Sequence, residues 1–323
     1  RLLNAISKDQ CIRFLDDWNA KRDHKSRVYV SYDSTNKNSE AGDIDIVEFG
    51  KAKDDKGFPV FNLSIAMDRT NRIPLFYEEY PGSVTDVSQF TFMVDKVLEY
   101  GYKQIGFILD RGYFSKENIR YIDENGYSFI IMCKGCKTLV SSLVLENRGT
   151  FEAKREAAIR AYKVYGITTT AKLYEDDTAE RYFHIYYNPS KQAAERERLE
   201  QRIEKLRQFM DRHVGKDEKF GKTYQEGIFL GADERTDVIE RELQLCGYFC
   251  IITSEKMTAS QALIQYKGRD ISEKLFQSDK TFIGSKSERV QSSQSMSSKI
   301  FIEFVALIVR NRIYNLLKEQ MIR

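Results

Sequence analysis

The first third of the chain alternates between patterns typical of strands and of helices. Arg27–Asp33 alternates polar and apolar positions, as a half-buried strand does, and it ends on an aspartate. Two further strand-like segments follow at Phe58–Asp68 and Arg72–Tyr80, and a short polar turn joins them. We therefore expect these three strands to form an antiparallel meander.

Beyond this meander the pattern predicts helices alternating with buried strands. Asp86–Tyr100 has apolar residues at helical spacing and is followed by Gly101, a typical C-terminal stop. Lys103–Asp110 is apolar at almost every position, as in a strand buried on both faces, and it also ends on an aspartate. Ser115–Lys134 predicts another helix and another buried strand. This order indicates an α/β fold in which the first and fourth strands are neighbours.

The rhythm is lost between about Gly135 and Leu245, which we expect to form a subdomain outside the central sheet. Mixed strand and turn signals there lead into a helix at Pro189–His213. One stripe of that helix is apolar and should pack in a core or on a partner helix. The stripe consists of Leu199, Ile203, Leu206 and Met210. Gly247–Thr253 then predicts one more buried strand, before the last two helices.

The segment after that strand contains four polar residues at successive offsets of three, four and seven. They are Tyr266, Arg269, Glu273 and Lys280. On a helix these offsets place the four side chains on one face. Ile264, Ile271 and Leu275 fall on the opposite face, which should pack on the core, and Thr258 with Gln261 predicts a capping box at the start. A polar helix face can also be simply solvated, so spacing alone leaves two interpretations.

Composition narrows the class of protein without deciding its function. With 323 residues and 41% hydrophobic residues, the chain can form one large domain or two ordinary ones. The net charge of +3 is too small to indicate a nucleic-acid partner, although basic residues outnumber acidic ones 11 to 6 from Tyr266 onward. The longest apolar run, Ile300–Val309, is far shorter than the roughly 20 residues of a membrane span, so we expect a buried helix there.

Five cysteines, an odd number, favour a reducing compartment over a disulfide scaffold. A four-thiolate zinc site is an alternative use for Cys133, Cys136, Cys246 and Cys250, although buried strands commonly contain such thiols. Because the chain opens on Arg1, we also expect it to be a piece of a longer protein.

Three acids are candidates for a metal site. Asp33 and Asp110 end predicted strands, where α/β sheets place ligand groups, and Glu273 lies on the predicted polar helix face. Three converging carboxylates can hold two hard divalent cations, which suit in-line displacement at a phosphodiester. Against this stands the abundance of acids, since the chain has 48 from which three can be chosen.

Three sequence blocks resemble the signatures of a known family and appear in the same order. They are YDST around Asp33, LDRGYFS around Asp110, and the Tyr-Arg-Glu-Lys pattern from Tyr266 to Lys280. Together they are similar to the bacterial DDE transposases of the "insertion sequence four" group. The resemblance implies an α/β, RNase H-like (retroviral integrase-like) mixed sheet flanked by helices, with an α+β insertion subdomain.

The resemblance also implies boundaries for the parts of the chain. Residues 1–26 would be an N-terminal helical remnant, and residues 27–134 the first part of the catalytic core. Residues 135–245 would be the insertion. Residues 246–323 would return to the core with its last strand, the signature helix and the C-terminal helix.

The same resemblance implies roles for individual residues. Asp33, Asp110 and Glu273 would be catalytic and bind two Mg²⁺ ions, with Mn²⁺ as a substitute. Tyr266, Arg269 and Lys280 would hold the phosphates of a transposon end. In one branch of the family a tryptophan four residues before a threonine stacks on a flipped base. This chain has Phe249 four residues before Thr253, which could serve either as a stacking platform or as a core residue.

The function implied is that of a transposase that cuts at the ends of an insertion sequence and joins the 3′-hydroxyls to target DNA. Its partner would be double-stranded DNA, bound by a homodimer, with no membrane, in the nucleoid region of the bacterial cytoplasm. Two alternatives remain: a catalytically silent or domesticated DNA-binding derivative, and an RNase H-like nuclease without strand transfer.

Overall fold

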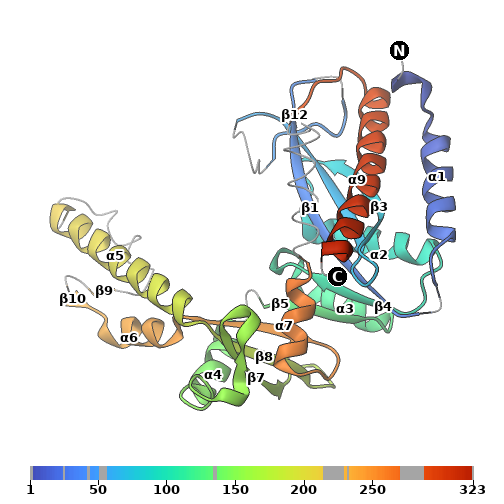
Figure 1. Cartoon of the computed structure of the whole chain (residues 1–323). Helices are drawn as coiled ribbons and strands as arrows, with labels where there is room; N and C mark the ends of the chain where they lie inside the picture. Colours follow the sequence, from blue (N-terminus) through green and yellow to red (C-terminus); the bar gives the residue numbers. More distant parts are fainter. Residues whose placement is uncertain are drawn as a thin grey trace. The chain divides into compact units, whose positions relative to one another are not determined.

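The computed structural model describes residues 3–24, 26–41, 44–50, 57–133, 137–213, 229–230, 233–269 and 287–321. The chain divides into two compact units (Figure 1). The first unit comprises Arg1–Lys134, Thr253–Glu255 and Leu263–Arg323, and the second comprises Gly135–Ile252 and Lys256–Ala262.

A mixed sheet forms the centre of the first unit. Its strands are β1 (Val28–Ser39), β2 (Val60–Asp68), β3 (Ile73–Pro81), β4 (Ile105–Leu109), β5 (Ser128–Met132) and β12 (Ser287–Glu288). The order is β3-β2-β1-β4-β5, with β12 pairing β1. The first three strands are antiparallel neighbours, while β4 runs parallel to both β1 and β5. The predicted meander, and the pairing of the first strand with the fourth, are therefore confirmed.

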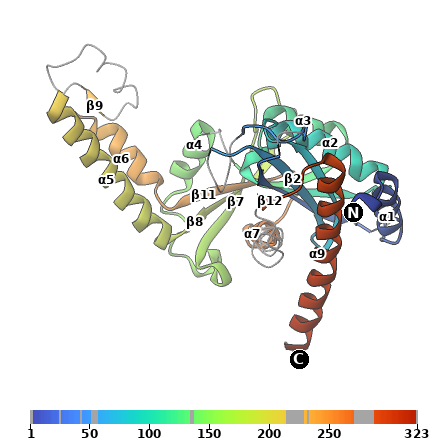
Figure 2. The ribbon, with the colours of Figure 1, turned by 90° about the horizontal axis from the view of Figure 1, so that it is seen from above.

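Helices cover both faces of this sheet. They are α1 (Lys8–Ala20), α2 (Asp86–Glu99), α3 (Lys116–Glu124) and α9 (Ser293–Met321), with short 3₁₀ turns η1 (Leu3–Ala5) and η2 (Arg111–Tyr113). Figure 2 shows α2 and α3 on one side and α9 on the other. Consecutive residues of β3 explain this arrangement, because side chains alternate along a strand. Phe76 packs on Tyr100 at the end of α2, whereas Tyr77 packs on Phe304 of α9.

Strand β1 is longer than the sequence predicts. The predicted strand ends at Asp33, but β1 continues to Ser39 through six polar residues that are all buried. Asparagine and lysine, which make up three of the six, are depleted in strands. Here they are held extended because β1 pairs with the apolar strand β2 from Val30↔Asp68 to Asn38↔Val60. Asp33 therefore lies in the middle of β1 and not at its end.

Helix α9 differs from the prediction of a fully buried helix, and it also explains how the polar half of β1 can be buried. The run Ile300–Val309 was expected to be buried, yet Ile302 and Val309 are exposed while Ile300 is buried. Glu303 lies on the buried side, where its Oε2 atom is 2.7 Å from the Nζ atom of Lys37 on β1. The two side chains are 5% and 0% exposed. This ion pair satisfies the charge that the polar half of β1 brings into the interior.

The second unit has its own strands and helices. The strands β11 (Tyr248–Thr253), β8 (Arg181–Tyr187), β7 (Val164–Ala171) and β6 (Ala158–Ile159) follow one another in that order, and β9 (Phe229–Leu230) pairs β10 (Asp233–Glu234). The helices are α4 (Lys137–Asn147), α5 (Pro189–His213) and α6 (Thr236–Leu245), with 3₁₀ turns η3 (Arg155–Ala157) and η4 (Arg160–Tyr162). Residues Thr253–Glu255, at and after the end of β11, belong to the first unit.

The apolar stripe of α5 packs as predicted. Leu199, Ile203 and Met210 form a buried cluster with Ile239 of α6, and Leu206 and Leu243 pack against it. The stripe is therefore a helix–helix contact. The proposed limits of an insertion, residues 135–245, remain a prediction. None of the described helices, α9 included, combines the length and the apolarity that a membrane span requires.

Candidate active site

Asp33 and Asp110 occupy matching positions on neighbouring parallel strands. The pairing of β1 with β4 runs from Val28↔Ile105 to Tyr32↔Leu109. Each aspartate is the residue that follows this last pair. The predicted neighbourhood on parallel strands is therefore confirmed, although only Asp110 follows the end of its strand.

The local backbone fixes both carboxylates. The Asp33 Oδ1 atom accepts a hydrogen bond from the Ser34 backbone N–H at 3.0 Å. The Asp110 Oδ1 atom accepts one from the Arg111 backbone N–H at 2.8 Å, as the N-cap of η2. These two hydrogen bonds orient the carboxylate groups. The side chains are 15% and 37% exposed, so both remain accessible from outside.

One guanidinium lies against both acids. The Arg269 Nη1 atom is 3.8 Å from Asp33 Oδ2, and its Nη2 atom is 3.7 Å from Asp110 Oδ1. The Tyr266 hydroxyl donates to Asp110 Oδ1 at 3.3 Å, and the Arg269 Cζ atom is 5.6 Å from the centre of the Tyr266 ring. We call Asp33 and Asp110 the acid pair. The structure thus brings together four of the residues singled out in the sequence.

The helix that carries Tyr266 differs from its prediction. Helix α7 (Ala259–Lys267) begins with the predicted capping box, in which the Gln261 N–H donates to Thr258 Oγ1 and the Thr258 N–H donates to the Gln261 side chain. It ends at Lys267, so Arg269 follows in a turn and its backbone N–H donates to the Tyr266 carbonyl at 3.1 Å.

The two sides of α7 are also exchanged relative to the prediction. Ile264, expected in the core, is 45% exposed, whereas Tyr266 is 3% exposed. Ala262 and Leu263 are fully buried and supply the packing that Ile264 was expected to give. Tyr266 is buried because its hydroxyl reaches Asp110, which gives an amphipathic side chain a polar partner inside the unit.

Arg69 is a residue at this site that sequence reasoning missed. It follows β2, and its Nη2 atom donates to the Ile264 carbonyl in the last turn of α7 at 3.1 Å. A Cβ atom on Gly268 would lie 2.0 Å from the Arg69 Nε atom, so glycine lets this guanidinium lie against the chain. Arg69 therefore satisfies a backbone carbonyl near the C-terminal end of α7, which lies two residues before Arg269 in the chain. Nothing in the sequence signals a contact across 195 positions.

The remaining predicted residues do not join this cluster in the part of the chain that is described. Glu273 and Lys280 lie outside the described residues. Phe249 belongs to the second unit, where its ring stacks on Tyr186 with centroids 4.8 Å apart and an interplanar angle of 18°. The Lys191 Nζ atom lies 5.9 Å from the same ring centroid. One face of Phe249 is therefore already covered by another aromatic ring.

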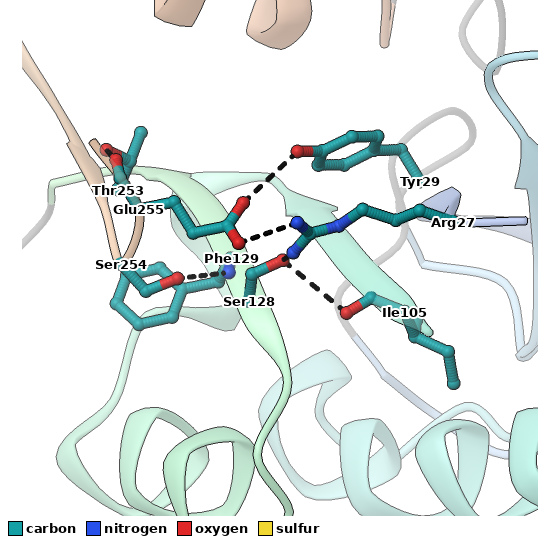
Figure 3. Close-up of polar contacts among 8 residues, drawn as sticks. All are labelled: Arg27, Tyr29, Ile105, Ser128, Phe129, Thr253, Ser254 and Glu255. Carbon is teal, nitrogen blue, oxygen red and sulfur yellow. Dashed lines mark hydrogen bonds and ion pairs between the residues drawn. The ribbon is translucent and has the colours of Figure 1, made fainter. Parts of the chain in front are cut away.

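A second polar cluster lies at the amino-terminal ends of the same strands (Figure 3). Arg27 lies just before β1, and its Nη1 atom is 2.6 Å from the Glu255 Oε1 atom. Its Nη2 atom donates to the Ser128 hydroxyl at the start of β5. Tyr29 donates to Glu255 at 3.3 Å, and the Ser254 hydroxyl accepts from the Phe129 backbone N–H at 2.9 Å. This cluster ties the turn after β11 to the sheet, at the end opposite to the acid pair.

The donor chemistry of the acid pair fits a hard divalent cation. Two carboxylates supply the oxygen ligands that Mg²⁺ and Mn²⁺ prefer, and they already face a positive charge in common. Within the described ranges, no group of three or more His, Cys, Asp or Glu side chains could hold a metal ion. A third carboxylate from Glu273 would complete the set that the sequence predicts, but that residue lies outside those ranges.

The comparison with protein families decides the affiliation. Residues 11–309 match a single family model, described as the transposase DDE domain. The chain belongs to this family. The matched region includes both members of the acid pair, together with Tyr266 and Arg269. No curated protein matches the chain.

Two solved structures show partial likeness. The piggyBac transposase synaptic complex with hairpin DNA is 7% identical, with a TM-score of 0.43, and the match covers 88% of this chain and 47% of that one. The Mos1 transposase paired-end complex with left transposon end is 12% identical, with a TM-score of 0.24, covering 38% and 40%. The chain thus spans about half the length of the piggyBac chain. With TM-scores below 0.5, the assignment rests on the family model.

Proposed function

We propose that this chain is the catalytic part of a DNA transposase, which cuts at the ends of an insertion sequence and joins the freed 3′-hydroxyls to target DNA. The observation that carries the proposal is the acid pair. In a chain of the transposase DDE family, two aspartates from separate sequence blocks meet beside one guanidinium on adjacent parallel strands. An RNase H-like arrangement of the sheet, with residues 135–245 as an insertion, is part of this proposal.

Asp33, Asp110 and Glu273 are the proposed ligands of two Mg²⁺ ions, for which Mn²⁺ substitutes. Bound divalent cations supply the charge that activates an attacking hydroxyl and stabilises the leaving oxygen of a phosphodiester. The protein's own contribution is to hold the carboxylates in place. The backbone N–H groups of Ser34 and Arg111 do this for the acid pair.

Tyr266, Arg269 and Lys280 are the proposed contacts to the phosphates of the DNA end. Arginine offers a planar fork for phosphate oxygens, tyrosine a hydroxyl donor and lysine a point charge. The proposed partners are double-stranded DNA ends and target DNA, held by a homodimer. Base stacking on Phe249 would use the ring face that Tyr186 leaves uncovered.

A nicking assay with Mg²⁺ or Mn²⁺ tests the catalytic assignment. Asp33→Asn and Glu273→Gln keep the size of the side chain but remove the charge that a hard cation needs, so the cleavage rate should fall by about 10³-fold or more. Glu255→Gln is the matched control, because it removes an arginine-paired acid at the opposite ends of the strands. Normal cleavage by Asp33→Asn would contradict the assignment.

Two further measurements separate the alternatives. A joining assay with a precut end should give strand-transfer products, whereas a nuclease of the same fold would cut and not join. A chain that binds DNA but neither cuts nor joins would be a silent derivative. In binding titrations without metal, Arg269→Ala should weaken affinity by about 1–3 kcal/mol and lower the salt slope by about one phosphate, while Glu273→Gln should bind equally or more tightly.

A further inference from the structure

The acid pair is already paired with a positive charge before any metal ion binds. Arg269 divides its guanidinium between the two carboxylates, with one terminal nitrogen near each. We propose that Arg269 is the resident counter-ion of the acid pair, and that a divalent cation must displace its guanidinium in order to bind there. This inference rests on the proposed function, because it assumes that the acid pair is a metal site.

The geometry favours exchange over a permanent ion pair. An arginine that pairs permanently with a carboxylate typically does so through two parallel hydrogen bonds of about 2.7–2.9 Å. At the acid pair, Arg269 approaches each carboxylate with one nitrogen, at 3.8 and 3.7 Å, which is longer than such bonds. Asp110 is also 37% exposed, so a hydrated cation can approach it from solvent.

Charge balance points in the same direction. Two ionised carboxylates on adjacent strands repel one another, and a guanidinium brings a single positive charge to them. A divalent cation brings twice that charge and therefore attracts the two carboxylates more strongly. Because the guanidinium stays protonated at every accessible pH, Arg269 can leave the pair only by moving and not by losing a proton.

The structure also shows which part of Arg269 can move. Its backbone is held, since its N–H donates to the Tyr266 carbonyl and Arg69 caps the preceding helix. Movement must therefore come from the side-chain torsions. The Tyr266 ring, 5.6 Å from the Arg269 Cζ atom, offers a nearby surface that can retain a displaced guanidinium through a cation–π contact. Metal loading would thereby release Arg269 toward a DNA phosphate.

The test is Mn²⁺ binding by the whole chain without DNA, measured by calorimetry. Arg269→Gln removes the competing charge, so it should bind Mn²⁺ at least about ten-fold more tightly than the wild-type chain. Arg269→Lys keeps a charge but cannot fork between two acids, so it should bind with intermediate affinity. Arg111→Gln is the control for the general loss of positive charge, because Arg111 is adjacent to Asp110 in sequence and exposed. It should change the affinity by less than about three-fold.

A second signal comes from thermal unfolding. Without metal, Arg269→Gln should unfold at a lower temperature than wild type, since the two carboxylates lose their counter-ion, and Mn²⁺ should raise its melting temperature by more. If wild type binds Mn²⁺ and Arg269→Gln binds no more tightly, the counter-ion proposal is wrong while the metal site stands. An equal increase in Mn²⁺ affinity in Arg269→Gln and Arg111→Gln would also overturn the counter-ion proposal. If no variant binds Mn²⁺, the metal site itself fails, and the proposal fails with it.

Discussion

Lys37 and Arg269 both bring a positive charge to carboxylates in the first unit, but in different ways. Lys37 pairs with Glu303 at 2.7 Å, and both side chains are almost completely buried. Arg269 faces two acids at 3.7–3.8 Å, and one of them is 37% exposed. A second lysine, Lys299, lies 3.8 Å from Glu303, so that acid has more than one cation near it. At the acid pair, one guanidinium lies against two carboxylates.

The difference separates a structural ion pair from an exchangeable one. Asp33 and Lys37 are four residues apart on β1, on the same side of the strand and roughly 13 Å from one another. A short and buried ion pair between Lys37 and Glu303 fixes the strand on α9. A longer and more exposed contact between one guanidinium and two carboxylates, a few residues away, is suited to accept a divalent cation. Strand β1 thus carries both a residue of a structural ion pair, Lys37, and a candidate metal ligand, Asp33.

The largest expected effect is on the structural pair. Lys37→Met removes the cation nearest to the buried Glu303 carboxylate and leaves Lys299 at 3.8 Å, so the free energy of unfolding should fall by about 3–4 kcal/mol. Denaturant titration measures it. The double variant with Glu303→Leu removes both charges and should recover most of the loss. A stable single variant would show that the pair is not structural.

A buried base in the second unit, His184, extends the comparison to a group whose Nδ1 atom lies 2.9 Å from the Thr168 hydroxyl oxygen. His184 is fully buried, and burial lowers its pKa to about 4. The unfolded chain takes up a proton near the ordinary value of 6.5, so stability is complete above that pH. It should fall by about 3 kcal/mol as the pH drops from 6.5 to 4. The measurement is the free energy of unfolding as a function of pH, for the wild-type chain and for His184→Gln. Identical slopes in the two proteins would contradict the lowered pKa of His184.

The support under Arg269 should respond to a single methyl group. In Gly268→Ala the new Cβ atom displaces the Arg69 guanidinium and breaks its bond to the Ile264 carbonyl, at a cost of about 1 kcal/mol of unfolding free energy. In an Arg69→Ala background the same change should cost little. A double-mutant cycle with no coupling between the two positions would remove Arg69 from the account.

The smallest effect is expected at the amino-terminal cluster. Arg27 and Glu255 form a short ion pair, but both side chains are more than one third exposed. Arg27→Gln should therefore lower unfolding free energy by about 0.5 kcal/mol, and added salt should reduce the difference. A loss comparable to that of Lys37→Met would show that this turn is a structural centre.

The sequence predicts an element well where its periodicity or its local residue chemistry alone determines the structure. The range of α5, the neighbouring strands β1 and β4, and the Thr258 capping box all follow from periodicity or local residue chemistry. The polar half of β1 could not be predicted, because it is extended by pairing with β2 and neutralised by a glutamate 266 positions away. The charged Glu303 inside an apolar run was the available signal for that pair.

The candidate site shows the same division. Sequence blocks identify Asp33, Asp110, Tyr266 and Arg269 as a set, and the structure brings those four together. The orientation of α7 was predicted wrongly, because helical spacing assumes that apolar side chains face the core. Tyr266 faces inward instead of Ile264, since its hydroxyl has a partner there. The contact of Arg69 with α7 depends on tertiary structure alone.

The most direct test of the account is a crystal structure of the chain with Mn²⁺, in which anomalous scattering locates the metal. The account predicts an anomalous peak between the carboxylates of Asp33 and Asp110, at roughly 2.0–2.6 Å from an oxygen of each, with the Arg269 guanidinium moved off the acid pair. No peak at the acid pair in saturating Mn²⁺, with Arg269 still against both carboxylates, would contradict it.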